Sequence, residues 1–369
     1  MNSFERLTAL MTGQPVDRPG ISTYELVGWN SDDFACKEPS YNKLMERIRN
    51  ETDCMYRSGG VCGPDIFGCK ETVKEWKEGV SFFRTIITHT PKGDLTRRYR
   101  TDDNIHTTWT LEHQLKTIDD IDKYLSIPWE AGAPHPEKLT LARERLGGTR
   151  GIPKFSLSDP ICTAAELFEF GQFTIYSNTD RDRILELLDI IHERNMIRYK
   201  ALAQCKELKG TMCRIVGPEY CTPPFMSPKL FDRFVGVYLD EMIDVLKKAG
   251  VFCRVHSHGK VKKTVDRIVA AGAQGLDPCE PLPDGDISLK DLRAKFPDLL
   301  LLGGVELHEL ERSTRARMKE VVVDCLEQAA TGPFILMPTA APINTPLSKQ
   351  TEDNYNAMID AFHEWCGRH

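Results

Sequence analysis

The sequence lacks the features that mark membrane and secreted proteins. Its longest apolar runs, such as Leu299–Leu302, fall far short of the roughly 18 residues that cross a bilayer, so we expect no membrane-spanning segment. Its 12 cysteines include no Cys-x-x-Cys pair. At the start of the chain, Glu5 and Arg6 interrupt any apolar stretch of a secretory signal. We therefore expect reduced thiols and a cytoplasmic location.

Motifs for nucleotide-driven chemistry and serine hydrolysis are also missing. The chain contains no Gly-x-Gly-x-x-Gly, no Gly-Lys-Ser/Thr loop and no Gly-x-Ser-x-Gly elbow. Positive charge is not in excess, because 48 lysines and arginines face 54 acidic residues and the net charge is −6. Proteins that bind nucleic acids through phosphates usually carry a basic surplus or stripe. We therefore expect no nucleic-acid partner.

The chain does contain the alternation of strands and helices that is typical of α/β proteins. It has 369 residues, of which 41% are hydrophobic and 28% charged, enough to form a large folded core. Amphipathic segments, such as the one that begins after Ser227–Pro228, separate short β-rich runs. Eight such runs predict a (β/α)₈ barrel. They are Gly20–Tyr24, Cys54–Arg57, Ile152–Ser156, Thr211–Val216, Val251–Val255, Gln274–Leu276, Leu299–Leu302 and Phe334–Met337.

One stretch does not fit this alternation. Residues 70–112 are rich in Thr, Val, Ile, Phe and Trp and carry a turn signal at Pro91–Lys92–Gly93. This composition predicts an antiparallel β-rich insertion. No repeat or low-complexity linker divides the chain, so we expect residues 1–369 to form a single barrel domain with this insertion.

Residue types that bind metals follow several predicted strands. In such barrels the active site forms at the carboxyl ends of the strands. The sharpest local signal is His256 with His258, because residues two apart on an extended chain point to the same face. With Glu280 as third ligand they would form an open zinc site. The alternative is that one histidine orders the loop and the other makes a core hydrogen bond.

Other residues near these strand ends are candidates for the same pocket. Glu219 would complete the metal site or act as a catalytic acid, and Glu280 would share this catalytic role. Asp277 would either orient a ligating histidine or cap a helix. Glu306 would either face the pocket or begin a helix. The remaining substrate-pocket candidates are Tyr220 and Cys279, the latter equally explained by buried packing.

These residues also carry a family resemblance. The sequence resembles the uroporphyrinogen decarboxylase-like superfamily along essentially its whole length, which implies a (β/α)₈ barrel. The residues that correspond to the substrate-binding Arg-Gln-Ala-Gly-Arg stretch of true uroporphyrinogen decarboxylases are Pro19–Glu25, which contain no arginine. The segments that carry the resemblance are Phe4-Glu5-Arg6-Leu7, Pro15-Val16-Asp17-Arg18-Pro19, Val255-His256-Ser257-His258-Gly259-Lys260, Asp277-Pro278-Cys279-Glu280-Pro281 and Thr345-Pro346.

The resemblance therefore implies the other branch, the corrinoid-dependent methyltransferases. Thiol-methylating members bind zinc through His-x-Cys, a Glu and a distant Cys. Here His256 and Glu280 match, His258 replaces the first Cys, and no ligand stands near Ala340–Ala341. Two imidazoles and a carboxylate make zinc more Lewis-acidic than two thiolates do, so it is better suited to bind a substrate oxygen than a thiol. The resemblance therefore implies the first methyltransferase of an O-demethylase. Its expected substrate is an aromatic methyl ether, and its cobalamin would come on a separate corrinoid protein.

Three other functions fit the sequence. The chain could be the second methyltransferase of such a system, which passes the methyl group to tetrahydrofolate. It could be a decarboxylase of a smaller acid, which would need a cationic clamp, for which Arg57, Arg84 and Arg214 are candidates. It could also be a non-catalytic binding barrel with structural histidines. Barrels of this superfamily often pair, so a homodimer is a further expectation.

Overall fold

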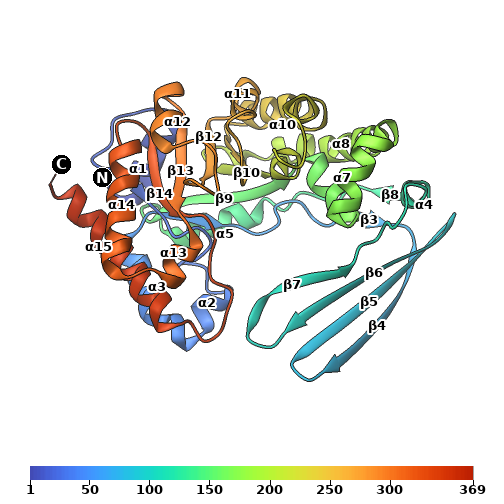
Figure 1. Cartoon of the computed structure of the whole chain (residues 1–369), viewed down its shortest axis with the longest axis horizontal. Coiled ribbons are helices and arrows are strands. Elements are labelled where there is room, and N and C mark those ends of the chain that lie inside the picture. The colour runs from blue at the N-terminus through green and yellow to red at the C-terminus, as the bar shows by residue number, and fades with distance from the viewer. Residues whose placement is uncertain (369) are drawn as a thin grey trace.

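The predicted barrel is present in the computed structural model, which describes residues 1–368 (Figure 1). Within these residues, eight parallel strands form one curved sheet in the order β1-β14-β13-β12-β11-β10-β9-β2. All eight predicted strands are confirmed. Their bounds are β1 Gly20–Ile21, β2 Cys54–Arg57, β9 Gly151–Ser158, β10 Met212–Val216, β11 Phe252–His256, β12 Gly275–Cys279, β13 Leu300–Val305 and β14 Phe334–Pro338.

The two edge strands of this sheet meet at a single backbone contact. The Asp53 N–H, just before β2, donates to the Ile21 carbonyl at the end of β1 over 2.7 Å. β1 is shorter than predicted and ends at Ile21, and the predicted strand could not have included Tyr24, which has a left-handed conformation with φ 58°. The freed residues turn towards the carboxyl end of the barrel, where they become part of the candidate site.

Helices cover the outside of the sheet (Figure 1). Their order along the chain follows the strands, which is why neighbouring strands are parallel. The α-helices are α1 Ser3–Thr12, α2 Phe34–Lys37, α3 Asn42–Glu51, α4 Asp120–Leu125, α5 Glu137–Leu146, α6 Pro160–Leu167, α7 Phe170–Thr179, α8 Arg181–Ala203, α9 Pro228–Phe231, α10 Val237–Lys248, α11 Val265–Ala270, α12 Leu289–Lys295, α13 Leu307–Arg312, α14 Arg315–Ala329 and α15 Lys349–Cys366. Shorter helical turns are η1 Pro39–Tyr41, η2 Lys206–Leu208, η3 Pro218–Cys221 and the π-helical η4 Asp232–Gly236.

The amino-terminal end of the barrel is closed by α1 and a buried ion-pair network. Arg6 on α1 donates to Asp53 at 2.6 Å and to Asp17 at 2.8 Å, and Arg18 donates to Asp53 at 3.0 Å. Asp53 is fully buried, so the two arginines supply the charge and donors that its carboxylate needs. The first two segments that carry the resemblance, Phe4–Leu7 and Pro15–Pro19, therefore stabilise the amino-terminal end of the barrel, away from the strand ends where chemistry is expected.

The barrel interior changes from apolar to charged along the strands. One buried cluster contains Ile152, Met212 and Phe252 from three neighbouring strands, together with Leu7 and Leu10 of α1. Because side chains alternate along a strand, the residues two positions further also point inward. Those residues are Lys154, Arg214 and Arg254. The charged layer therefore lies directly above the apolar floor.

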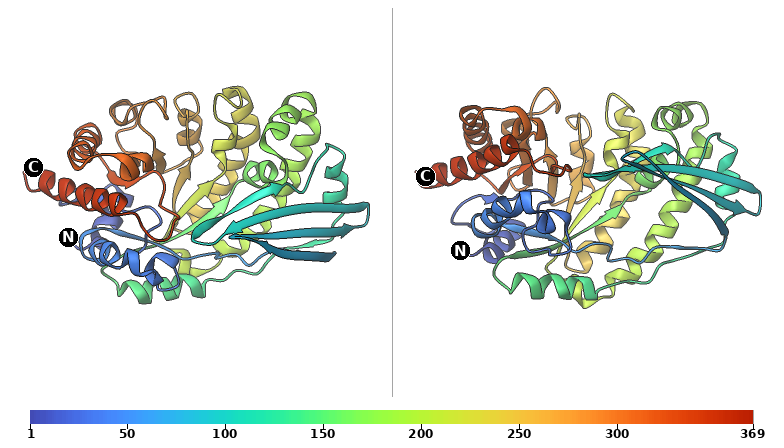
Figure 2. Two further views of the ribbon diagram at one scale, coloured as in Figure 1. Left: turned by 60° about the horizontal axis from the view of Figure 1, so that its bottom comes forward. Right: turned by 90° about the horizontal axis from the view of Figure 1, so that it is seen from below.

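The predicted insertion forms an antiparallel sheet that projects from one side of the barrel (Figures 1 and 2). Its strands are β4 Lys70–Glu78, β5 Ser81–Thr90, β6 Gly93–Asp102 and β7 Ile105–Glu112, and the small pair β3 Ile66–Phe67 and β8 Trp129–Glu130 stands at its base. The start of β7 contacts the loop after β14. There the His106 N–H donates to the Ile343 carbonyl at 2.6 Å, and the His106 ring is 2.8 Å from the Thr345 hydroxyl.

Membrane insertion by a helix finds no support in this fold. None of the helices within residues 1–368 is long and apolar enough to cross a bilayer.

Candidate active site

The centre of the candidate site is the end of β11 beside β12. His256 is the last residue of β11 and pairs in register with Asp277 of β12. The His256 Nδ1 lies 3.0 Å from an Asp277 carboxylate oxygen, and the Arg254 Nε lies 3.2 Å from the other. Burial alone would raise the pKa of Asp277, but Arg254 and His256 outweigh it and hold that pKa well below its usual range. Asp277 is therefore ionised.

This contact fixes the tautomer of His256. An ionised carboxylate can only accept, so the His256 Nδ1 carries the proton and donates it to Asp277. Burial also lowers the pKa of His256, more strongly than Asp277 raises it, so the ring is neutral near pH 7. The Nε2 atom keeps its lone pair, as a metal ligand or a general base requires. Of the two interpretations of Asp277, the structure shows the one in which it orients His256.

His258 makes a different pair with Glu280. The His258 Nδ1 is 2.5 Å from one Glu280 carboxylate oxygen, and the Gly259 N–H donates to the other over 2.5 Å. Burial would lower the pKa of His258, but the hydrogen bond and charge of Glu280 raise it overall. Burial would likewise raise the pKa of Glu280, but His258 and the Gly259 N–H lower it. The two residues therefore form an ion pair when His258 is protonated.

The two histidines are neighbours, but they are not aligned as strand periodicity predicts. β11 ends at His256, so the alternation does not extend to His258. Their ring centroids are 4.6 Å apart and the rings are nearly perpendicular, at 88°. Among residues 1–368, the group of three side chains whose metal-ligand atoms all lie within 4.8 Å of one another is a different one, Asp284, Glu306 and His308.

Glu219 and Tyr220 lie on η3, directly after β10. A Glu219 carboxylate oxygen accepts from the Gly217 N–H over 3.0 Å. The Glu219 charge also contributes to raising the pKa of both His256 and His258. The Tyr220 ring packs 5.5 Å from that of Phe170, and burial raises the pKa of its hydroxyl. Glu219 therefore lies within electrostatic range of both histidines.

The remaining two sequence candidates lie in different surroundings. Cys279 is 3% exposed, belongs to the core between sheet and helices, and directs its Sγ to the Leu276 carbonyl at 3.4 Å. Burial raises the pKa of its thiol to about 12, so Cys279 contributes packing there as an inert thiol. Glu306 is the residue directly before α13, so it begins a helix, as one of its two alternatives predicts. The cavity that it lines does not include the two histidines or Glu280.

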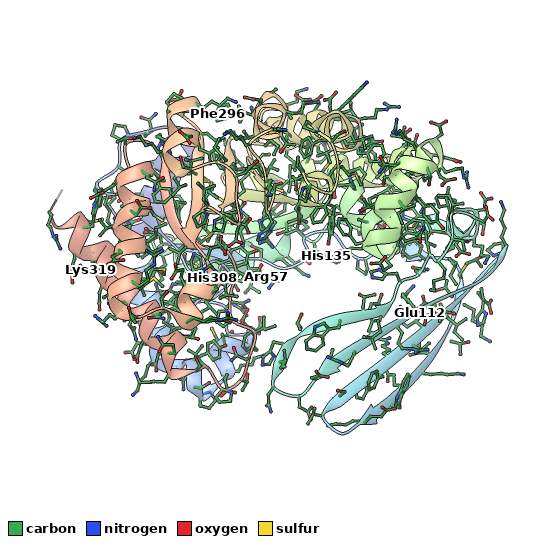
Figure 3. All side chains as sticks on the ribbon, viewed as in Figure 1. Arg57, Glu112, His135, Phe296, His308 and Lys319 are labelled. Carbon is green, nitrogen blue, oxygen red and sulfur yellow. The ribbon has the colours of Figure 1, made fainter. Side chains whose placement is uncertain are left out.

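A group of charged residues beneath the histidines includes two of the three candidates for a cationic clamp, Arg57 and Arg214. Arg214 donates to the Tyr24 hydroxyl at 2.9 Å and to Glu25 at 3.1 Å, and Arg57 donates to the same Glu25 at 3.1 Å. Figure 3 labels Arg57 near the centre of the molecule, with Glu112 out on the projecting sheet. The signal in the sequence was the presence of charged residues at inward positions of otherwise apolar strands, as in Met212–Val216.

Two members of this charged layer are fully buried. Lys154 and Arg254 are 0% exposed, and the Lys154 Nζ and the Arg254 Nη2 have no hydrogen-bond partner among the described residues. Burial and the nearby arginines hold the pKa of Lys154 well below its usual value. Burial lowers the pKa of Arg254 too, although Asp277 opposes this. The interior below His256 is thus rich in donors with few acceptors.

Comparison with known proteins identifies the family of this barrel. The sequence profile of the family described as uroporphyrinogen decarboxylase (URO-D) matches residues 106–365. The chain belongs to the URO-D family. No curated protein sequence matches it.

Solved structures resemble this URO-D family chain in fold. A methyltransferase from Methanosarcina mazei is 17% identical, covers 99% of this chain and 99% of its own, and superposes with a TM-score of 0.60. A B12-independent methionine synthase from Shewanella sp. W3-18-1 is 11% identical, with 74% of this chain and 76% of its own covered and a TM-score of 0.45. At such identities the first likeness establishes the barrel fold of the URO-D family chain.

Proposed function

We propose that this chain is a methyltransferase that takes a methyl group from an aromatic methyl ether and passes it to cob(I)alamin on a separate corrinoid protein. The observation that carries the proposal is His256, whose Nδ1 is held by the ionised Asp277 so that Nε2 keeps its lone pair at the mouth of the barrel. His258, Glu280 and Glu219 surround it with further metal-ligating groups.

The donor chemistry of these residues fits zinc. His256, His258 and Glu280 offer two imidazoles and a carboxylate, and the carboxylate of Asp277 behind His256 is the usual support for a ligating histidine. Zinc bound there would polarise the ether oxygen and stabilise the charge of the leaving phenolate. Binding would replace the contact between His258 and Glu280, because a metal ligand must present a lone pair.

The chain's own residues would perform three other tasks. Asp277 fixes the orientation and tautomer of His256. Glu219, fixed by the Gly217 N–H, would donate a proton to the leaving oxygen or complete the coordination sphere. Tyr24 and Arg214, joined by a 2.9 Å hydrogen bond, would form the floor on which the substrate rests.

The cobalamin would have to come from a partner. The described chain contains no Asp-x-His-x-x-Gly corrinoid motif, since Arg254 occupies the place two residues before His256. A corrinoid protein would therefore dock over the barrel mouth, and the insertion, which contacts the loop after β14, stands beside that mouth.

Metal content and methyl transfer test the proposal together. We expect about one zinc per chain at this site, lost in His256→Ala, and methylation of free or protein-bound cob(I)alamin by methoxyphenols, followed by absorbance. Glu112→Gln, on the projecting sheet, is the matched control and should keep both properties. Full zinc and full demethylation in His256→Ala would show that the assignment is wrong. Transfer from methyl-cobalamin to tetrahydrofolate, without ether demethylation, would favour the second methyltransferase of such a system.

A second candidate is a decarboxylase acting on a small acid. Arg57 and Arg214 converge on Glu25 at the mouth, where a substrate carboxylate could replace Glu25 as their partner. Arg84 does not join them, because it lies on β5 and pairs with Glu75 at 3.4 Å. Carbon dioxide release from a panel of aromatic and aliphatic acids, abolished by Arg214→Met and insensitive to chelators, would favour this function over methyl transfer.

A further inference from the structure

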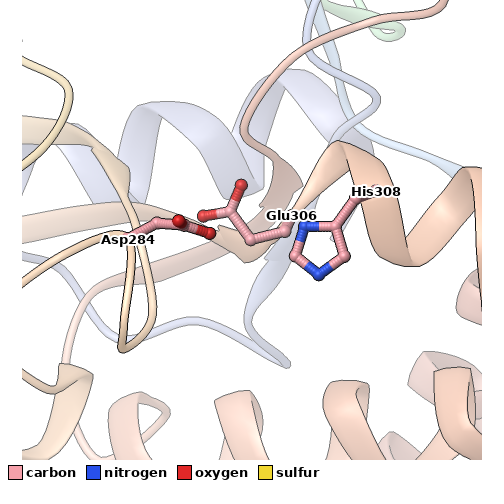
Figure 4. A group of neighbouring side chains, drawn as sticks. All are labelled: Asp284, Glu306 and His308. Atoms are coloured by element: carbon pink, nitrogen blue, oxygen red, sulfur yellow. The ribbon is translucent and has the colours of Figure 1, made fainter.

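A second candidate site lies beyond the ends of β12 and β13. Asp284 comes from the loop between β12 and α12, Glu306 ends the turn after β13, and His308 is in the first turn of α13. Figure 4 shows the three side chains together, with the Glu306 carboxylate between the other two. One ligand atom from each lies within 4.8 Å of the other two.

The Glu306 carboxylate has one oxygen without a partner. Its Oε2 accepts from the Thr339 hydroxyl at 2.9 Å, while Oε1 is buried and has no hydrogen-bond partner within residues 1–368. Glu306 is 9% exposed, so water does not fully solvate this charge. A buried carboxylate oxygen that lacks a donor is costly unless a cation or proton compensates it. This observation is independent of the spacing of the three residues.

The surroundings add negative charge and leave space. The three residues line a cavity of about 600 Å³. The cation that also lines it, Arg317, is paired with Glu309 at 3.0 Å and with Glu320 at 3.6 Å, so it does not neutralise Asp284 or Glu306. Asp324 is a further acidic residue of the cavity wall. The electrostatic balance of the cavity thus favours a cation.

We propose that Asp284, Glu306 and His308 bind a divalent transition-metal cation, with the remaining coordination positions open to the cavity. Two carboxylates and one imidazole suit Zn²⁺ or Mn²⁺. The bound cation connects the β12–α12 loop to the start of α13 and removes the repulsion between the two carboxylates. The site is separate from the histidine pair of β11, and the proposal stands whether or not the proposed methyl transfer is correct.

Calorimetric titration of chelator-treated protein with Zn²⁺ tests this site. His258→Ala protein should retain one Zn²⁺ site, because its substitution does not touch the cavity. Adding Glu306→Gln to the His258→Ala protein should weaken Zn²⁺ binding at least roughly tenfold, because mutating even a residue that only hydrogen-bonds to a metal ligand costs that much affinity. His308→Asn changes an exposed side chain, so it should fold normally and also weaken binding. Glu320→Gln removes a charge from the same cavity without removing a ligand and should leave the affinity unchanged.

A thermal readout keeps the test decisive if a variant is less stable. Zn²⁺ should raise the melting temperature of His258→Ala protein, because a ligand that binds only the folded state stabilises it. This rise should disappear when His308→Asn is added and persist with Glu320→Gln. The proposal would be overturned if Glu306→Gln and His308→Asn left the Zn²⁺ affinity of the His258→Ala protein unchanged, or if Glu320→Gln lowered that affinity as much as they do.

Discussion

The two halves of the barrel interior differ in what fills them. The amino-terminal half contains Ile152, Met212 and Phe252, packed against α1. Two residues further along the same strands, Lys154, Arg214 and Arg254 fill the carboxyl-terminal half, below His256 and Asp277. The first half stabilises the fold by removing apolar surface from water. The second half holds charges inside the protein, which costs stability and is typical of functional sites.

The comparison shows how one architecture serves both purposes. Inward positions recur every second residue, so a strand of five residues such as β11 places a packing residue, a charged residue and a site residue on one line. In β11 these are Phe252, Arg254 and His256. Substitutions at different heights along the strands should therefore affect stability and activity in different proportions.

The largest effect should come from Asp277, because it supports both Arg254 and His256. Asp277→Ala leaves Arg254 buried without its carboxylate, and removing one partner of a buried pair destabilises a protein by about 3–5 kcal/mol. His256 would also lose the acceptor that fixes its tautomer. Chemical denaturation should show the loss of stability, and methyl-transfer assays the loss of activity. A variant with normal stability and activity would contradict this role.

The apolar half should respond in stability alone. Met212→Ala creates a cavity in the packed floor, for which a loss of about 2–5 kcal/mol is usual. Because Met212 lies below the charged layer, the fraction that remains folded should keep its Zn²⁺ affinity at the histidine site. Denaturation with urea and metal titration at low temperature would separate the two effects. A stable Met212→Ala protein with lost metal binding would remove the distinction between the halves.

Lys154 should show how much the buried charged layer lowers the stability of the fold. Lys154→Met keeps the volume and removes the buried amine, so stability near pH 7 should stay equal or rise by about 1 kcal/mol. The pKa of Lys154 is lowered in the folded state, so unfolding takes up a proton at pH values between that lowered pKa and the ordinary lysine pKa of 10.5. Wild-type stability should therefore rise with pH across this window, by at most about 1.4 kcal/mol per pH unit.

Denaturation midpoints measured from pH 7 to pH 10 would check this, because Lys154→Met should lose that part of the slope. Identical slopes for the two proteins would mean that Lys154 is not the buried neutral amine of the folded state.

The smallest effect on stability should come from Arg57 at the rim. Its side chain is 51% exposed, and exposed ion pairs contribute roughly 0–1 kcal/mol. Arg57→Ala should leave the unfolding midpoint almost unchanged. If the site binds an anionic substrate, Arg57→Ala should raise the KM for that substrate. For an uncharged ether, the KM of Arg57→Ala should equal that of the wild type. The ratio of the two KM changes would show which substrate class the mouth accepts.

Several elements could be predicted from the sequence because their signals are local. Each of the eight barrel strands and the insertion at residues 70–112 combines β-rich composition with nearby turn or helix signals. The contact between Asp277 and His256 was one of two alternatives for Asp277, because residue type and strand order place the two residues at neighbouring strand ends. The sequence pattern cannot show that β11 ends at His256, because strand ends depend on which backbone groups find partners in the neighbouring strands.

What the sequence by itself determined is the periodic part of this protein: parallel strands, covering helices, and metal-ligating residues at the strand ends. Only the tertiary structure decided which of these residues meet. It paired His258 with Glu280, brought Asp284 of the β12–α12 loop to Glu306 and His308 at the start of α13, and directed Arg57 and Arg214 to Glu25. The physical reason is that contacts between loops depend on how the closed sheet orients each strand end, and no local pattern of residues records that orientation.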